Sequence, residues 1–162
     1  MQHARGSEYL GAHVSVQGGV HRAPVRGRAI GATAIQVFTK TPGQWREPAI
    51  PQESLSAFRT ECERLELSSI VAHDSYLINL ASPDPLLSAR SETSFIEELR
   101  RCEAYHIRFL VSHPGNYIDD RSAGLSRNAA AYTRCLRAVP GDVMVLLETT
   151  AGCGTALGSN FE

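Results

Sequence analysis

The sequence predicts an α/β fold in which parallel strands alternate with helices. Five apolar runs of strand length recur through the 162 residues, and segments with helical spacing separate them. The runs are apolar almost throughout, which is typical of parallel strands covered by helices rather than of a sheet with one face in water. They begin near Tyr9, Thr33, Ser69, Ile107 and Val143.

Three of these runs end in a residue that can bind a metal ion. His73 follows Ser-Ser-Ile-Val-Ala, His113 follows Ile-Arg-Phe-Leu-Val-Ser, and Glu148 follows Val-Met-Val-Leu-Leu. Forty residues separate His73 from His113 and 35 separate His113 from Glu148, about the length of one strand–helix unit of a (β/α)₈ barrel. The carboxyl ends of barrel strands converge on one rim, so we expect the three side chains to be neighbours.

A metal site explains this set better than three unrelated structural residues, although a lone histidine at a strand end is more often structural than a ligand. A carboxylate placed directly after an apolar strand, as Glu148 is, would be buried unpaired without a nearby cation or donor. Two imidazoles and a carboxylate suit zinc or a similar divalent ion. We therefore predict His73, His113 and Glu148 as metal ligands. His13 also ends a strand run on the same rim, and we expect it to have a non-ligand role.

A barrel is favoured over a doubly wound nucleotide-binding sheet. The segment from Gly11 to Gly19, after the first run, contains neither of the glycine-rich phosphate loops that such sheets carry. A barrel needs eight strand–helix units and about 250 residues, whereas five units are begun before the chain ends at Glu162. We expect an incomplete (β/α)₈ TIM barrel with its first five strands and four intervening helical segments. Residues 1–162 would be the amino-terminal part of a single domain whose carboxy-terminal part is missing.

Three helices are predicted clearly and the first connecting segment only weakly. Asp84-Pro85 is typical of an N-cap followed by proline at the first helical position. Residues 125–138 are predicted to form another helix. The helix prediction for the segment after Gly19 is weak, because Pro24 and Gly27 oppose a continuous helix. The remaining helix is predicted from apolar side chains that recur at helical spacing at Leu55, Phe58, Cys62 and Leu65. In the helix of residues 125–138, we expect the side chains that face inward to be Ala129, Tyr132 and Leu136.

Composition places the chain among ordinary globular proteins. Apolar residues make up 43%, charged residues 20%, and the formal charge is −1, so a nucleic-acid partner is neither indicated nor excluded by overall charge. The amino terminus has no apolar leader and no run approaches membrane-spanning length, so we expect a cytoplasmic protein without a membrane partner. Without C-x-x-C spacing, reduced thiols are expected rather than disulfides at Cys62, Cys102, Cys135 and Cys153.

Two loops beside the predicted metal site carry aromatic and polar residues. Residues 39–46 hold Lys40, Gln44 and the only tryptophan, Trp45, and this loop either contacts phosphates or simply packs on the barrel. Tyr76 and Leu77 follow His73 closely. They are either ordinary packing residues or a wedge that enters a base stack.

These segments together resemble the endonuclease IV family, the abasic-site endonucleases also called deoxyribonuclease IV. The resemblance runs from Tyr9 to the end of the chain and corresponds to the amino-terminal portion of the family. Its most specific part is the octapeptide from His73 to Leu80. The segments that carry it are Gly11-Ala-His-Val-Ser15, Phe38-Thr-Lys40, Gln44-Trp45-Arg46, His73-Asp-Ser-Tyr-Leu-Ile-Asn-Leu80, His113-Pro-Gly115, and Glu148 with Thr150-Ala-Gly152.

The resemblance implies a (β/α)₈ barrel with three zinc ions that incises the phosphodiester bond 5′ of an abasic site in base excision repair. It implies that His73 and His113 bind one zinc and that Glu148 bridges two, which gives Glu148 a catalytic role. The residues expected to contact or enter the DNA are Tyr76, Leu77, Lys40, Gln44 and Trp45. The departures from the family pattern are Gly43, where arginine is frequent, and Thr149 and Cys153, where asparagine and glutamine are usual.

The remaining family ligands would lie beyond Glu162. We therefore expect this chain to hold at most one zinc firmly and to be inactive and a poor independent folder, whereas the complete protein would be a monomer acting on DNA that contains abasic sites. Two alternatives stay open. One is a sugar isomerase or epimerase barrel with a single divalent metal, and the other is an inert truncated fragment.

Overall fold

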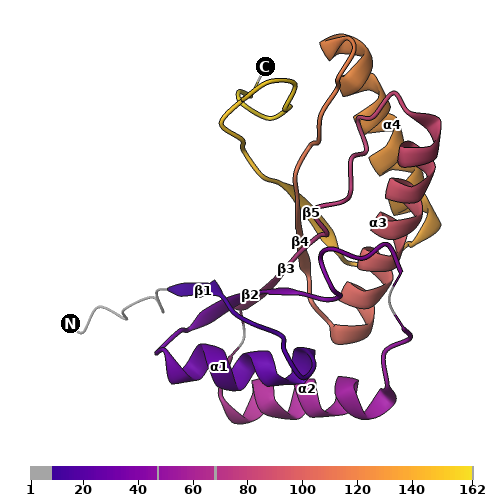
Figure 1. Ribbon diagram of the computed structural model, residues 1–162. Helices are drawn as coiled ribbons and strands as arrows, with labels where there is room; N and C mark the ends of the chain where they lie inside the picture. Colours follow the sequence, from indigo (N-terminus) through magenta and orange to yellow (C-terminus); the bar gives the residue numbers. More distant parts are fainter. Residues whose placement is uncertain (1–8, 47, 68, 162) are drawn as a thin grey trace.

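A five-stranded parallel sheet organises the computed structural model, which describes residues 9–46, 48–67 and 69–161 (Figure 1). The strands pair in chain order, β1 to β5. Their bounds are β1 Gly11–His13, β2 Ala34–Phe38, β3 Ser69–His73, β4 Phe109–Ser112 and β5 Met144–Leu147. The helices between them are η1 Val20–Arg22, α1 Ala23–Ala29, α2 Gln52–Arg64, α3 Pro85–Tyr105 and α4 Arg121–Ala138.

The sheet is curved and open. All the helices of the described segments lie on its outer side, with α1 and α2 beneath β1 to β3 and α3 and α4 beside β3 to β5 (Figure 1). β1 and β5 form the two edges and do not pair with each other. The expected incomplete (β/α)₈ barrel, with five strands and four connecting helical segments, is confirmed.

Strand register separates a helix-facing row from a row on the open face. Val37 pairs with Ala72, and Ala72 pairs with Leu110, and all three are buried in the core against the helices. The next residue of each strand points the other way. The register therefore places Phe38, His73 and Val111 in one row on the open face.

The helix signals in the sequence have local physical causes that the structure bears out. Asp84 caps α3, its carboxylate accepting hydrogen bonds from the amides of Leu86 at 2.8 Å and Leu87 at 3.2 Å. The first connection is short, as its proline and glycine predict, and it forms only η1 and α1. Gly27 is required there, because a Cβ on it would come within 2.3 Å of the Ile35 side chain on β2.

The predicted inward face of α4 is wrong at two of three positions. Ala129 and Leu136 are exposed, and Leu136 is 40% accessible, whereas Tyr132 is buried as predicted. The buried face contains Asn128, whose amide donates to the Pro114 carbonyl at 2.8 Å. Asn128 shares this face with Gly124, Ala131, Tyr132 and Cys135, and a hydrophobic pattern could not reveal its bond to the end of β4. The helix also begins four residues earlier than predicted, at Arg121.

Disulfide bonds and membrane-spanning helices are not expected, and the findings on both concern the described residues alone. All four cysteines are free thiols, as predicted, and three of them lie within α2, α3 and α4. Among the helices that the structure describes, none combines the length and the apolar character needed to cross a lipid bilayer.

Candidate metal centre

The three predicted ligands meet at the carboxyl end of the sheet. His73 is the last residue of β3, His113 directly follows β4, and Glu148 directly follows β5. The register places them on the same open face, because His113 lies two residues beyond Val111, the partner of His73, and Glu148 lies two beyond Leu146. One potential ligand atom from each of the three lies within 4.8 Å of the others. Strand ends separated by up to 75 residues thus form one cluster.

Glu148 sits between the two imidazoles. Its Oε2 lies 3.1 Å from Nε2 of His73 and 3.8 Å from Nε2 of His113, and the two rings are 5.3 Å apart. The His73 side chain is nearly buried, whereas those of His113 and Glu148 are 47% and 45% exposed. The cluster is therefore buried on the β3 side and exposed to solvent on the β5 side.

Hydrogen bonding fixes the tautomer of His73. Its Nδ1 lies 2.9 Å from the backbone carbonyl of Asp74, and a carbonyl can only accept, so Nδ1 carries the proton. The lone pair of Nε2 then faces the Glu148 carboxylate. The Nε2 lone pair of His73 and the Glu148 carboxylate are both acceptors, and a cation between them, either a proton or a metal ion, relieves their repulsion. A ligating histidine commonly donates its second ring N–H to a carbonyl or carboxylate, so the donor set fits zinc.

A buried chain of hydrogen bonds supports this corner. Ser112 Oγ donates to Asp74 Oδ2 at 2.5 Å and lies 2.7 Å from the hydroxyl of Tyr132, which donates to it. Burial raises the pKa of Asp74 well above its usual range, and the bond from Ser112 opposes that rise. Burial likewise raises the pKa of Tyr132. Sequence reasoning missed these residues, although Asp74 and Ser112 each adjoin a predicted ligand.

His13 lies one row further from the cluster. It pairs in register with Gln36, and its ring is 4.4 Å from the ring of Phe38. Burial and the nearby charge of His73 lower the pKa of His13. It does not belong to the convergent set found within the described part of the chain, and its non-ligand role stays a prediction.

The predicted DNA-contacting residues fall into two groups. Tyr76 is 70% exposed and packs edge-on against Phe38 at 5.2 Å, and Leu77 beside it is half-buried. Gln44 is exposed and Trp45 is half-buried. Tyr76 and Leu77 lie in the loop after β3, next to the metal cluster, and Gln44 and Trp45 lie in the loop after β2. Contact of these four residues with DNA stays a prediction.

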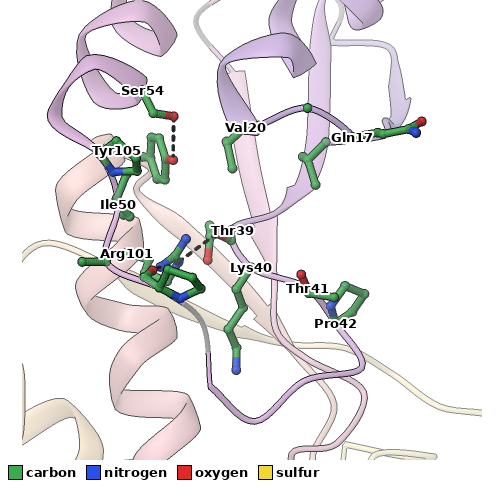
Figure 2. Close-up of a pocket in the computed structure, with 16 residues that line it drawn as sticks. Gln17, Val20, Thr39, Lys40, Thr41, Pro42, Ile50, Ser54, Arg101 and Tyr105 are labelled. Carbon is green, nitrogen blue, oxygen red and sulfur yellow. Dashed lines mark hydrogen bonds between the residues drawn. The ribbon is translucent and has the colours of Figure 1, made fainter.

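Lys40 differs from this group, since it is only 3% exposed. Its ammonium lies 3.8 Å from Glu98 Oε1 and donates to Ser94 Oγ at 2.6 Å. Figure 2 shows Lys40 among residues that line a cavity of about 460 Å³ between the loops after β1 and β2. A side chain with these partners supports the loop from inside rather than presenting its charge to a ligand.

The three departures from the family pattern lie at the surface. A Cβ on Gly43 would meet nothing within 4 Å. Thr149 and Cys153 are both exposed in the segment after Glu148.

Comparison with known proteins relates this chain to nucleases. The family described as xylose isomerase-like TIM barrel matches residues 26–162. A probable endonuclease 4 from Chloroflexus aurantiacus is 47% identical over 155 residues, which are 94% of this chain and 54% of that protein. This chain spans about half the length of the curated relatives it matches.

Solved structures agree with this relationship. Endonuclease IV from Thermus thermophilus matches with a TM-score of 0.84 and 30% identity, over 95% of this chain and 56% of that one. D-Psicose 3-epimerase from Clostridium cellulolyticum matches with a TM-score of 0.62 and 12% identity, over 87% and 49%. At 12% identity the epimerase shares only the fold. The resemblance inferred from the sequence is confirmed.

Proposed function

This chain belongs to the xylose isomerase-like TIM barrel family, and we propose that it forms the metal-binding part of an endonuclease IV that cuts DNA 5′ of abasic sites. The observation that carries the proposal is the convergence of His73, His113 and Glu148 beside an exposed Tyr76. The relatives named endonuclease 4 or endonuclease IV, at 47% and 30% identity, support it. A cytoplasmic, monomeric complete enzyme with three zinc ions is the form we propose.

His73, His113 and Glu148 would hold the ion in this chain. Zinc in such a site supplies Lewis acidity toward a phosphodiester oxygen and charge to stabilise the developing negative charge. His73 is the best oriented ligand, because its proton is fixed on Nδ1 by the Asp74 carbonyl. Glu148 reaches both imidazoles with one oxygen, so its second oxygen is available to a further cation.

The rim side chains would recognise the lesion by shape. Tyr76 stands exposed on Phe38 beside the cluster, and Leu77 follows it. An aromatic–aliphatic pair of this kind can enter a base stack, and a nucleotide without a base has little stacking to lose when it is turned out. Gln44 and Trp45 would contact the strand from the neighbouring loop. The formal charge of −1 means that affinity must come from such local groups and the metal ions rather than from an overall basic field.

A sugar isomerase or epimerase is the competing function, and the epimerase match supports only a shared fold. That function requires a pocket that closes around a small polyol. The exposed Tyr76 beside Leu77, and the neighbouring loop of Gln44 and Trp45, suit a polymeric substrate better.

The test is a chimera in which this chain replaces the matched segment of the Chloroflexus aurantiacus relative. The chimera, loaded with zinc, should cut a duplex at one central abasic site and lose the activity after prolonged chelation. Its Glu148→Ala variant should stay folded and be inactive, because two imidazoles are left without the carboxylate between them. Glu92→Gln is the matched control, since Glu92 is a carboxylate paired with Arg134 on the helical surface.

Robust cutting by the Glu148→Ala variant, or turnover of D-psicose in place of DNA cleavage, would refute the proposal. Failure of the folded, zinc-loaded chimera to cut would leave the inert fragment as the better description of this chain.

A further inference from the structure

A second group of buried charges lies behind the rim, away from the metal cluster. Its centre is Glu98 on α3, which is 1% exposed. Glu98 Oε2 accepts a hydrogen bond from Thr39 Oγ1 at 2.7 Å, and Oε1 accepts one from the Ser75 amide at 3.1 Å. Oε1 also lies 3.8 Å from the Lys40 ammonium. One carboxylate therefore binds the loop after β2 and the loop after β3.

The loop after β2 is bonded to α3 at several points. Lys40 donates to Ser94 Oγ at 2.6 Å and to the Gln44 carbonyl at 3.4 Å. Arg101 donates from Nε to the Thr39 carbonyl at 2.8 Å and from Nη1 to the Pro48 carbonyl at 3.0 Å, and Figure 2 shows it directly beside Thr39. These bonds fix both ends of the segment that carries Gln44 and Trp45.

The loop after β3 is joined to the same network. The Ser75 amide binds Glu98, and the Ser75 hydroxyl donates to the Pro42 carbonyl at 2.5 Å. Ser75 Oγ also accepts from the Leu77 amide at 3.3 Å. Ser75 thus connects the segment of Tyr76 and Leu77 both to α3 and directly to the loop of Trp45.

A buried ion pair of this kind is a costly way to stabilise a fold. Removing Glu98 and Lys40 from water carries a desolvation penalty that their attraction offsets only in part, and an apolar pair of similar volume is often as stable. Burial raises the pKa of Glu98, and the hydrogen bonds from Thr39 and Ser75 and the positive charges of Lys40 and Arg101 oppose the rise. What an apolar pair could not supply is the set of directed bonds to two loops.

We propose that Glu98 is a positioning residue that couples the loop of Gln44 and Trp45 to the loop of Tyr76 and Leu77, so that the two DNA-contacting segments keep one relative placement. The inference rests on the proposed function only in naming DNA as what the two loops contact. It also explains why Lys40, a cation in a rim loop, is turned into the protein.

Trp45 gives a direct readout, because it is the only tryptophan of the chain. We would record its emission spectrum and its quenching by acrylamide in the 162-residue chain without metal or DNA. Glu98→Gln keeps the volume but removes the charge, and Ser75→Ala removes the hydroxyl through which the loop after β3 bonds the Pro42 carbonyl. Both should shift the Trp45 emission to longer wavelength and increase its quenching. Glu92→Gln, on the same helix, should leave the spectrum unchanged.

Circular dichroism would establish that each variant is folded. If Glu98→Gln alone does not fold, the double variant Lys40→Gln with Glu98→Gln replaces it in the measurement. The neutral amide pair should restore folding and still show the altered Trp45 spectrum. An unchanged Trp45 spectrum in folded Glu98→Gln would overturn the proposal. A spectrum that responds to Glu98→Gln but not to Ser75→Ala would overturn the coupling, since the loops would then be held separately.

Affinity for abasic DNA is measured on the chimera. Glu98→Gln should weaken it about tenfold, which corresponds to about 1.4 kcal/mol and lies within the range for coupled residues. Zinc affinity should be unchanged, because no metal ligand is altered. A chimera that cuts no abasic DNA contradicts the proposed function, whereas the Trp45 spectra decide the coupling independently.

Discussion

Replacing Ser112 by alanine should destabilise the protein more than the loss of one hydroxyl suggests. Ser112 is fully buried between Asp74 and Tyr132, donating to the first at 2.5 Å and accepting from the second at 2.7 Å. Its removal leaves a buried carboxyl group without its hydroxyl donor. It also removes the 2.7 Å partner of the Tyr132 hydroxyl, which then keeps the distant His113 carbonyl, at 3.5 Å, and the Asn128 side chain.

The expected cost follows from the number of buried groups that lose a partner. Each costs about 1–3 kcal/mol, so Ser112→Ala should lower the free energy of unfolding by about 3 kcal/mol. For a chain of this size that corresponds to a fall in Tm of about 6–12 °C. Thermal unfolding of dilute protein, followed by circular dichroism, would measure it. Ser126→Ala, which removes an exposed hydroxyl on the helix that carries Tyr132, should change Tm very little.

A double variant makes the prediction sharper. Tyr132→Phe removes the hydroxyl that Ser112→Ala would leave without a good acceptor, so the combined variant should be no less stable than Ser112→Ala alone. Simple addition of the two single effects, or a fall in Tm of less than about 2 °C for Ser112→Ala, would show that the hydrogen-bond chain does not support this corner.

Four further predictions concern metal, DNA, pH and association. Elemental analysis of the zinc-loaded 162-residue chain should find at most one firmly held ion per molecule, and three would contradict the ligand assignment. Gly43→Arg should tighten binding of the chimera to DNA and steepen its salt dependence by about one phosphate contact, because the position is open; an unchanged salt slope would argue against this. Since the pKa of Glu98 is raised in the folded state, the folded protein binds a proton on Glu98 more tightly than the unfolded protein does. The stability that this bound proton contributes is lost as pH rises above about 4.5. Glu98→Gln lacks that loss, so its stability relative to the parent should improve from about pH 4.5 upward in urea titrations, and a difference independent of pH would refute the assignment. Size-exclusion chromatography of the chain should show association through the open edges and face of the sheet, whereas a cooperatively melting monomer would rule it out.

Much of the site was predictable because its determinants are local. Each ligand directly follows an apolar run, and parallel strands carry their carboxyl ends to one edge, so the convergence of His73, His113 and Glu148 needed no tertiary information. The cap at Asp84 was likewise predictable, because the capping carboxylate and the amides it binds lie within three residues.

The buried polar residues could not be predicted, because their partners lie far away in the sequence. Lys40 reads as a surface cation in a rim loop, and only the fold brings it to Glu98, on a helix that begins beyond the next strand. Asn128 was overlooked for the same reason, since its partner is a backbone carbonyl on another element. A hydrophobic pattern indicates which side chains are buried, but not which distant group forms a hydrogen bond with a buried polar side chain.

The supports of the metal centre are unequal in a way that bears on its affinity. His73 is held by its own strand neighbours and by the Asp74 carbonyl, and the β4 end that carries His113 is held by α4. Glu148 follows β5, an edge strand paired on one side only, and is held through its amide to the Ser112 carbonyl at 3.0 Å. Its backbone is therefore held on one side only in the described residues, although its carboxylate is the group that lies between the two imidazoles. Zinc affinity in this chain should be limited by the ordering of Glu148 rather than by the histidines, because ordering a flexible ligand costs conformational entropy on binding.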